Sequence, residues 1–433
     1  MFVYAQFIAM FILVLSIFGL SGCQEKQNPE IAPNIYYAPI NGSNAVSVHL
    51  IFENTSDQPG LMHYLEHLVG HNIKGPNDRV FVQHANAWTT RYSVGYWRSG
   101  KPDKLEQLLA SLRKTIEPLE VGEEYALEER GIVLNEYDFR LGNNYSAQAF
   151  EEINATLHAG NRIATSVIGT PKQINELRYD DAVILHQKSH VVQQAKLVVT
   201  GDVSLSQLRR ALERVEWPVA STSNQFGAGR YHLKKAFTQR LEFADENTVP
   251  RFVWQKVIAL DTPVELELLR AQTALLSSIL ESNLPGGLAG PLRFDGTTTS
   301  GFSFQVFPLD EKHLQINFSG KPDKGVKLVD VEAEFQAELL KLAKQGIPPK
   351  TWQRLRKRFD DYWPDLEDQG NVEKWYARYV TSSIYQQKEP KSVKKLLRMK
   401  NGISQEETNK YLKLLVGEGA QVIAFIGPEE VFR

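Results

Sequence analysis

The sequence contains very little cysteine and almost no excess charge of either sign. Cys23 is the single cysteine among 433 residues, so the chain can form no intramolecular disulfide. With 49 basic and 51 acidic side chains the formal net charge is −2, which gives no general attraction to nucleic acid, and we expect no nucleic-acid partner. The remaining composition, 42% hydrophobic and 23% charged, is that of a globular protein with room for two or three domains.

The first 20 residues, MFVYAQFIAMFILVLSIFGL, contain no charged side chain and lead into Leu-Ser-Gly-Cys. This segment resembles a bacterial lipoprotein signal, which is cleaved just before a cysteine that then carries lipid. The resemblance implies that residues 1–23 form the signal with Cys23 as the lipidation site, although the usual Lys or Arg near the start is missing. The alternative is an uncleaved membrane helix, because the run is about long enough to span a bilayer. In both cases we expect the bacterial cell envelope, and Gln24 resembles the address of a lipid-anchored protein on the periplasmic side of the outer membrane.

Hydrophobic periodicity predicts two α+β halves. The elements expected in the first half are a strand at 45–53, a helix at 60–72, an extended region at 88–97, helices at 104–116 and 123–141, and a buried strand at 195–203. Residues 217–230 are rich in Ser, Gly and other helix breakers and predict a linker. The elements expected beyond it are strands at 252–260, 314–320 and 421–430 and a helix at 265–283. The similar order and similar closing strands indicate a duplicated domain.

A possible metal site lies in GLMHYLEHLVGHN, residues 60–72. His63 and His67 are one helical turn apart, so both imidazoles project from the same face, as two ligands of one zinc ion require. Glu66 is adjacent and could accept a proton from a water on that metal. His71 competes for a ligand role because it is also four residues from His67, but no carboxylate in the base position accompanies that pair. A polar stripe on an ordinary helix is the alternative to a metal site.

A catalytic zinc normally takes three protein ligands, so the third must come from another element. Glu129 and Glu136 lie seven residues apart in EEYALEERGIVLNEYDFR, which is two helical turns and places both carboxylates on one face. Glu136 as a ligand and Glu129 as its support would complete a site with two histidines and one glutamate.

The inverted order H-x-x-E-H, with a strand before it and E-x₆-E after it, resembles the pitrilysin-type (M16) zinc metallopeptidases, the inverzincins. Further segments are similar to the family: HANAWTTRYSVGY resembles its N-A-x-T segment, IGTPKQINEL its I-G-x-x-x-x-I element, and LVVTGDV the strand that closes its first domain. The resemblance implies an α+β fold with two homologous α/β-sandwich domains of the LuxS/MPP-like type. The N-terminal catalytic domain would span 24–218, the linker 219–232 and the C-terminal domain 233–433.

The same resemblance implies a role for each matching residue. His63, His67 and Glu136 would hold one Zn²⁺ per chain. Glu66 would be the catalytic general base, and Glu129 a second catalytic-site carboxylate that supports the site. The implied activity is that of a zinc metalloendopeptidase that hydrolyses peptides or unfolded protein segments. The alternatives are a catalytically silent scaffold or assembly subunit with the same fold, and a metal-binding protein without catalysis.

Substrate-binding residues follow from the resemblance too, and one of them departs from the family pattern. Asn86 and Ala87 would lie on the edge strand against which an extended peptide aligns. The family often carries an Arg followed seven residues later by a Tyr, whereas this sequence has Arg293 in GPLRFDGTTTSGFSF but Ser300 at the second position, with Phe302 the nearest aromatic. Neither can replace a phenol as an oxyanion donor in the same geometry. We therefore expect a partner: a second M16-like subunit that carries the Arg/Tyr pair, or a second copy in a homodimer.

Overall fold

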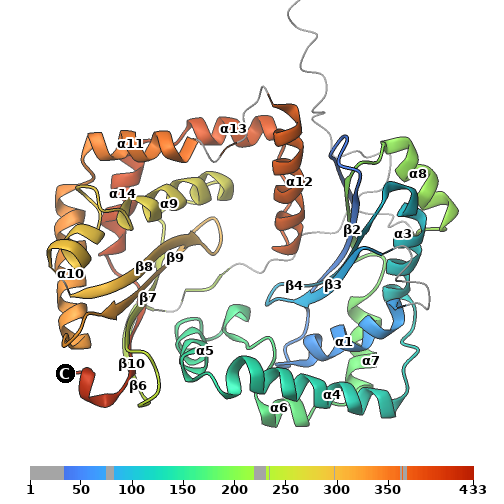
Figure 1. The fold of residues 1–433 in the computed structure, drawn as a ribbon, viewed down its shortest axis with the longest axis horizontal. Helices are drawn as coiled ribbons and strands as arrows, with labels where there is room; N and C mark the ends of the chain where they lie inside the picture. The colour runs from blue at the N-terminus through green and yellow to red at the C-terminus, as the bar shows by residue number, and fades with distance from the viewer. Residues whose placement is uncertain are drawn as a thin grey trace, which may run out of the picture.

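The computed structural model describes residues 34–74, 82–218, 231–233, 235–296, 298–360, 363 and 368–433. Two five-stranded sheets, each accompanied by helices, lie beside one another (Figure 1). Cys23 with the expected lipoprotein signal, and residues 219–230 of the expected linker, lie outside the described residues. None of the helices within these ranges is both long enough and apolar enough to cross a bilayer.

The first sheet has the strand order β1-β5-β2-β4-β3. Its strands are β1 (Ile35–Pro39), β2 (Val46–Glu53), β3 (His84–Thr89), β4 (Ser93–Gly100) and β5 (Lys196–Gly201). Only the β1–β5 pair is parallel. Alternate residues of β2 from Val46 to Phe52 are buried in the core of this half, because successive side chains of a strand point to opposite faces. β3 forms one edge of the sheet.

The second sheet repeats this topology with the order β6-β10-β7-β9-β8. Its strands are β6 (Phe237–Ala244), β7 (Arg251–Ala259), β8 (Thr299–Pro308), β9 (His313–Pro322) and β10 (Ala420–Gly427). Here too a single pair, β6–β10, is parallel, and the last strand of the half joins the sheet between its first two. The prediction of two homologous α/β halves is therefore confirmed.

Helices cover both sheets. The first half contains α1 (Leu61–Ile73), α3 (Leu105–Arg113), α4 (Glu123–Tyr137), α5 (Tyr145–Leu157), α6 (Pro171–Asn175), α7 (Tyr179–Ser189) and α8 (Leu205–Arg214). The second contains α9 (Leu266–Leu280), α10 (Leu328–Gln345), α11 (Pro349–Asp360), α12 (Gln369–Tyr385), α13 (Val393–Asn401) and α14 (Gln405–Leu415). α1 follows β2 and precedes β3, as α9 follows β7 and precedes β8, so the two helices are positional counterparts.

Each half contributes one helix to the other half's sheet. α5 packs on β7 and β10 of the second sheet, where its Ala149, Ile153 and Leu157 are buried. α12 packs on β1 and β5 of the first sheet and stands between the two halves in Figure 1. Ala377 and Ile384 of α12 are buried there in a separate apolar cluster. The halves are thus held together through both sheets.

The structure differs from the sequence expectations in local detail. The extended region at 88–97 is a hairpin, in which the amide of Thr90 donates to the carbonyl of Ser93 over 2.7 Å. The helix expected over 123–141 ends at Tyr137 and continues as one wide turn, Asp138–Gly142. The strands β1, β6 and β8 were not predicted, and all three are edge strands of their sheets.

Candidate metal centre

α1 is fixed at its start and at its middle. Gly60 precedes it with a φ of 81°, and a Cβ there would lie 2.6 Å from the carbonyl oxygen of Ile168, so no other residue fits this position without strain. The Tyr64 hydroxyl donates over 2.6 Å to the carbonyl of Ala126 in α4. Because the apolar residues of α1 are buried in the core, these contacts fix which way its polar side chains face.

The structure brings His63, His67 and Glu136 together. Glu136 Oε2 lies 3.3 Å from His63 Nε2 and 3.5 Å from His67 Nε2. Two ligand atoms of a tetrahedral zinc ion, each about 2.05 Å from the metal, are separated by about 3.3 Å. One nitrogen or oxygen atom from each of the three residues lies within 4.8 Å of the others. Both the donor set and the spacing therefore fit a zinc ion.

Glu129 contacts His67 at the ring nitrogen that does not face Glu136. His67 Nδ1 donates to Glu129 Oε2 over 2.9 Å, which leaves Nε2 directed toward Glu136. The Tyr125 hydroxyl donates to the other oxygen of Glu129 over 2.6 Å. A carboxylate that holds the far nitrogen of a histidine fixes its tautomer and ring orientation, which is the usual arrangement behind a metal-ligating histidine. Glu129 is placed where this role requires.

The surroundings shift the pKa values of the three residues in different directions. Burial opposes the charged form of His67, but hydrogen bonds to Glu136 and Glu129 outweigh it and raise the pKa of His67. The bond to His67 lowers the pKa of Glu136, whose second oxygen pairs with Arg140. Burial, reinforced by the neighbouring His67, lowers the pKa of His63 to about 4, so His63 is neutral near pH 7. A metal binds a neutral imidazole and a carboxylate, so His63 and Glu136 have the form that a metal requires, whereas a proton on His67 must leave when the metal binds.

Glu66 lies beside this group and accepts a hydrogen bond of 2.8 Å from Thr89 Oγ1 of β3. Burial raises the pKa of the Glu66 carboxyl, and the bond from Thr89 partly opposes that rise. A carboxylate with a raised pKa is suited to accept and return a proton near neutral pH. His71 lies elsewhere: its ring packs at 4.3 Å against Tyr125, and it is not in the group formed with Glu136.

Asn86 and Ala87 lie on the edge strand β3, opposite Trp97 and Tyr96 of β4. Among the described residues β3 pairs only with β4, so its other edge presents backbone N–H and C=O groups without a partner strand. Ala87 packs against the core of the first half. The edge is geometrically open to strand addition.

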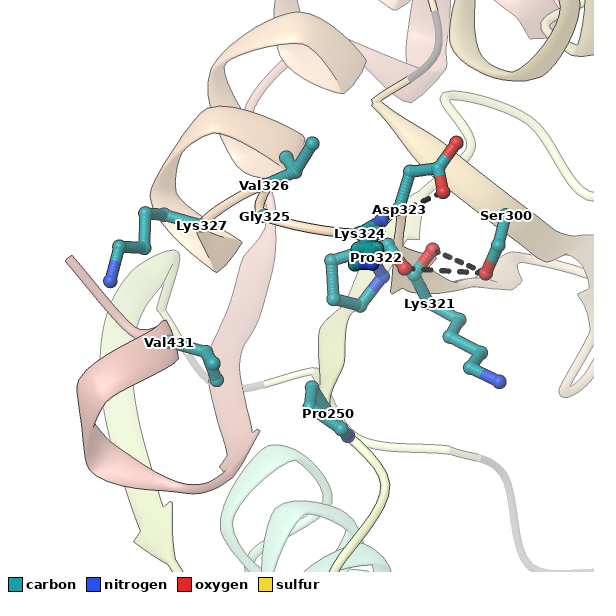
Figure 2. Close-up of a pocket in the computed structure, with 10 residues that line it drawn as sticks. All are labelled: Pro250, Ser300, Lys321, Pro322, Asp323, Lys324, Gly325, Val326, Lys327 and Val431. Carbon is teal, nitrogen blue, oxygen red and sulfur yellow. Dashed lines mark hydrogen bonds between the residues drawn. The ribbon is translucent and has the colours of Figure 1, made fainter.

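The structure does not bring Arg293 to the metal group. Arg293 is exposed in a wide turn, Gly290–Asp295, and its guanidinium lies 5.3 Å from the ring centre of Phe294. Ser300 donates to the carbonyls of Lys321 and Pro322, as the dashed lines in Figure 2 show. Ser300 also lines a pocket of about 450 Å³, and every residue that lines this pocket belongs to the second half. Phe302 stacks on Phe318 instead of facing the first half.

Three contacting residues were given no role by the sequence reasoning. Arg140 could have been identified from the sequence, because it lies four residues after Glu136 and opposite charges at this spacing pair on a helix. Tyr125, four residues before Glu129, shows the same spacing. Thr89 had a signal as the threonine of the N-A-x-T segment, but its contact with Glu66 depends on how β3 passes α1.

No family model matches the sequence, and no curated protein matches it. Similar solved structures exist. The first half of the periplasmic protease PqqL from Escherichia coli has a TM-score of 0.74 and 14% identity, with 92% of this chain and 90% of that one covered. The full-length PqqL structure is covered over 46% of its length. A peptidase M16 inactive domain from Pseudomonas fluorescens has a TM-score of 0.71 and 13% identity, with 92% of this chain and 96% of that one covered. A protease from Helicobacter pylori has a TM-score of 0.67 and 17% identity, with 91% of this chain and 97% of that one covered. At these identities the likeness concerns the fold.

Proposed function

Because the chain has the fold of M16-like peptidases, we propose that it is a zinc-dependent endopeptidase that hydrolyses peptides or unfolded protein segments. The observation that carries this proposal is the group of His63, His67 and Glu136 with the buried carboxylate of Glu66 beside it. The similar structures include an inactive domain, so the fold by itself does not distinguish an enzyme from a silent scaffold. The complete set of ligands and base favours the enzyme.

Each residue has a defined task in this proposal. His63, His67 and Glu136 would hold a zinc ion, which supplies positive charge to polarise a scissile carbonyl and to acidify a water molecule. Glu66 accepts the proton of the attacking water and returns it to the leaving nitrogen. Thr89 keeps the Glu66 carboxylate in one orientation through its 2.8 Å hydrogen bond. The free edge of β3, at Asn86 and Ala87, aligns the peptide as an added strand.

The decisive test is Glu66→Gln, which keeps the side-chain volume but removes the proton acceptor. Metal content measured by elemental analysis should stay at one zinc per chain, while hydrolysis of an unstructured fluorogenic peptide should fall at least ~100-fold, the usual contribution of a general base. The matched control is Glu124→Gln, an exposed glutamate at the start of α4. Unchanged turnover in Glu66→Gln would refute the mechanism. A wild-type protein that binds zinc without hydrolysing any peptide would favour the silent scaffold or a metal-binding role.

We also propose that the site is completed by a partner. Arg293 is exposed and the position seven residues later is a serine with its hydroxyl bound to backbone carbonyls, so this chain offers no phenol there. Full-length PqqL is about twice the length that this chain covers, so in that protein a second half accompanies the matching one. The proposed partner is a second M16-like chain with the Arg/Tyr pair or a second copy of this chain. Mass photometry, and peptidase assays with and without a second M16-like chain that carries an Arg/Tyr pair, test this. Full activity as a monomer would refute it.

Lipid anchoring at Cys23 is a proposal from the sequence, and it agrees with the periplasmic location given for PqqL. Metabolic labelling with a fatty acid should tag the wild type and not Cys23→Ala. In cell fractionation, Cys23→Ala should leave the outer-membrane fraction. Labelling that persists in the variant would refute the assignment.

A further inference from the structure

We propose that the groove between α12 and the first sheet binds a carboxylate of the peptide substrate, several residues away from the scissile bond. This inference rests on the proposed peptidase function. The groove has a volume of about 550 Å³. Its floor is the sheet face that carries Ser47, His49, Trp88 and Thr200, and its wall is α12.

One stripe of α12 faces the groove. The residues of this stripe recur at helical spacing: Lys374, Ala377, Arg378, Thr381, Ser382 and Tyr385. They lie on the helix that the second half lends to the first sheet, so the groove exists only where the two halves meet. A ligand in it contacts both halves at once.

The charge of the groove has one sign. No aspartate or glutamate lines it, while Lys374 and Arg378 do. Both side chains are exposed, and neither forms an ion pair within the described part of the chain. Burial lowers the pKa of His49 to about 4, so at neutral pH this imidazole adds no charge. Two cations beside hydroxyl groups, with the nearby Glu373 engaged by Asn41 and no acid in the lining, favour a carboxylate.

The groove begins at the strand that would align the substrate. Trp88 of β3 stacks on Tyr385 with ring centres 4.4 Å apart and lines the groove. The next residue, Thr89, has its hydroxyl on Glu66. Successive side chains of a strand point to opposite faces, so Trp88 faces α12 while Thr89 faces α1 and the metal group. A peptide paired with β3 therefore presents alternate side chains to the two faces, and the segment that continues along α12 enters the groove.

The length of the groove sets the position of the carboxylate. Arg378 and Lys374 precede Tyr385 by seven and eleven residues, about 10 and 16 Å along a helix. An extended peptide advances about 3.3 Å per residue. The carboxylate should therefore lie three to five residues from the one that contacts Trp88. It can be an Asp or Glu side chain at that place, or the free carboxyl end of a peptide that stops there.

Binding is measured with Glu66→Gln, so that no peptide is hydrolysed. Fluorescence anisotropy is recorded with neutral, C-terminally amidated peptides in which one Glu is moved along the sequence, each matched by a Gln peptide. A second series ends in a free carboxylate at successive lengths. We expect one window of positions at which the acid improves Kd about 2- to 5-fold over its amide, as for exposed charge pairs. If the peptides with a moved Glu show this improvement, the bound group is an acidic side chain. If the peptides with a free end show it, the bound group is the C-terminal carboxylate.

Adding Lys374→Gln and Arg378→Gln should bring the acid-to-amide ratio close to one. The control pair, Arg210→Gln on α8 and Lys344→Gln on α10, removes the same two charges from exposed positions outside the groove and should leave the ratio unchanged. Equal binding of acid and amide peptides at every position would overturn the proposal, as would an equal loss in the control pair. If the groove discriminates but wild-type protein hydrolyses nothing, the peptidase function fails and the groove stands.

Discussion

Replacing Glu129 by alanine tests whether this carboxylate prepares His67 for a metal. Its Oε2 accepts from His67 Nδ1 over 2.9 Å, and the two side chains are only 12% and 20% exposed. A hydrogen bond to a charged group contributes about 1.5–3 kcal/mol net, which is roughly a 10- to 150-fold change in an equilibrium constant. Loss of a carboxylate behind a metal-ligating histidine typically costs about 10- to 100-fold in metal affinity. We therefore expect Glu129→Ala to weaken zinc binding about 10- to 100-fold.

Zinc affinity is measured by competition with a chromophoric chelator, and kcat/KM is then measured at saturating zinc. Tyr125→Phe keeps the carboxylate and removes one neutral donor to it, a change of about 0.5–1.5 kcal/mol, so zinc affinity should fall by roughly 2- to 10-fold. The control is Glu128→Ala, the exposed neighbour on the same helix. The reasoning is refuted if Glu129→Ala and Glu128→Ala bind zinc equally well.

Two further predictions concern the base and the junction between the halves. Burial raises the pKa of Glu66, and the hydrogen bond from Thr89 lowers it. Thr89→Val should therefore move the acid limb of the pH profile of kcat/KM to higher pH, and Thr89→Ser should restore it. An acid limb that does not move in Thr89→Val would contradict this. A Cβ on Gly95 would lie 2.3 Å from the Tyr385 ring, so Gly95→Ala should lower the free energy of unfolding in urea by about 1–3 kcal/mol. The control is Gly131→Ala on α4, where the added Cβ meets no other atom. This substitution should raise the free energy of unfolding by about 0.5–1 kcal/mol. A free energy of unfolding that is unchanged or raised in Gly95→Ala would show that α12 is not docked there.

Much of the site could be predicted from the sequence because its residues lie on two regular helices. The spacing of His63 and His67, and of Glu129 and Glu136, needs only the helical repeat to place each pair on one face. That the two faces meet depends on how α1 packs against α4, which periodicity does not contain. Only the resemblance to a known family related them.

Three features could not be predicted from the sequence: the contact of Thr89 with Glu66, the turn of the hairpin at 88–97, and the strand β1. Thr89 reaches Glu66 because β3 is the edge strand beside α1, a consequence of sheet order. The hairpin at 88–97 was read as one extended region because its turn, Thr90 to Tyr92, contains no glycine, proline or asparagine. β1 was not predicted because it has five residues and follows a polar stretch, so it shows too little alternation.

The exchange of α5 and α12 has a consequence for a chain cut between its halves. Each fragment would retain a sheet whose cover belongs to the other fragment, and would carry the helix that the other sheet requires. Neither piece could bury its apolar face alone, but the two together could, with no peptide bond joining them. A nick between residues 218 and 231 should therefore yield a complex that co-purifies as one particle, and two separately produced fragments should complement each other when mixed.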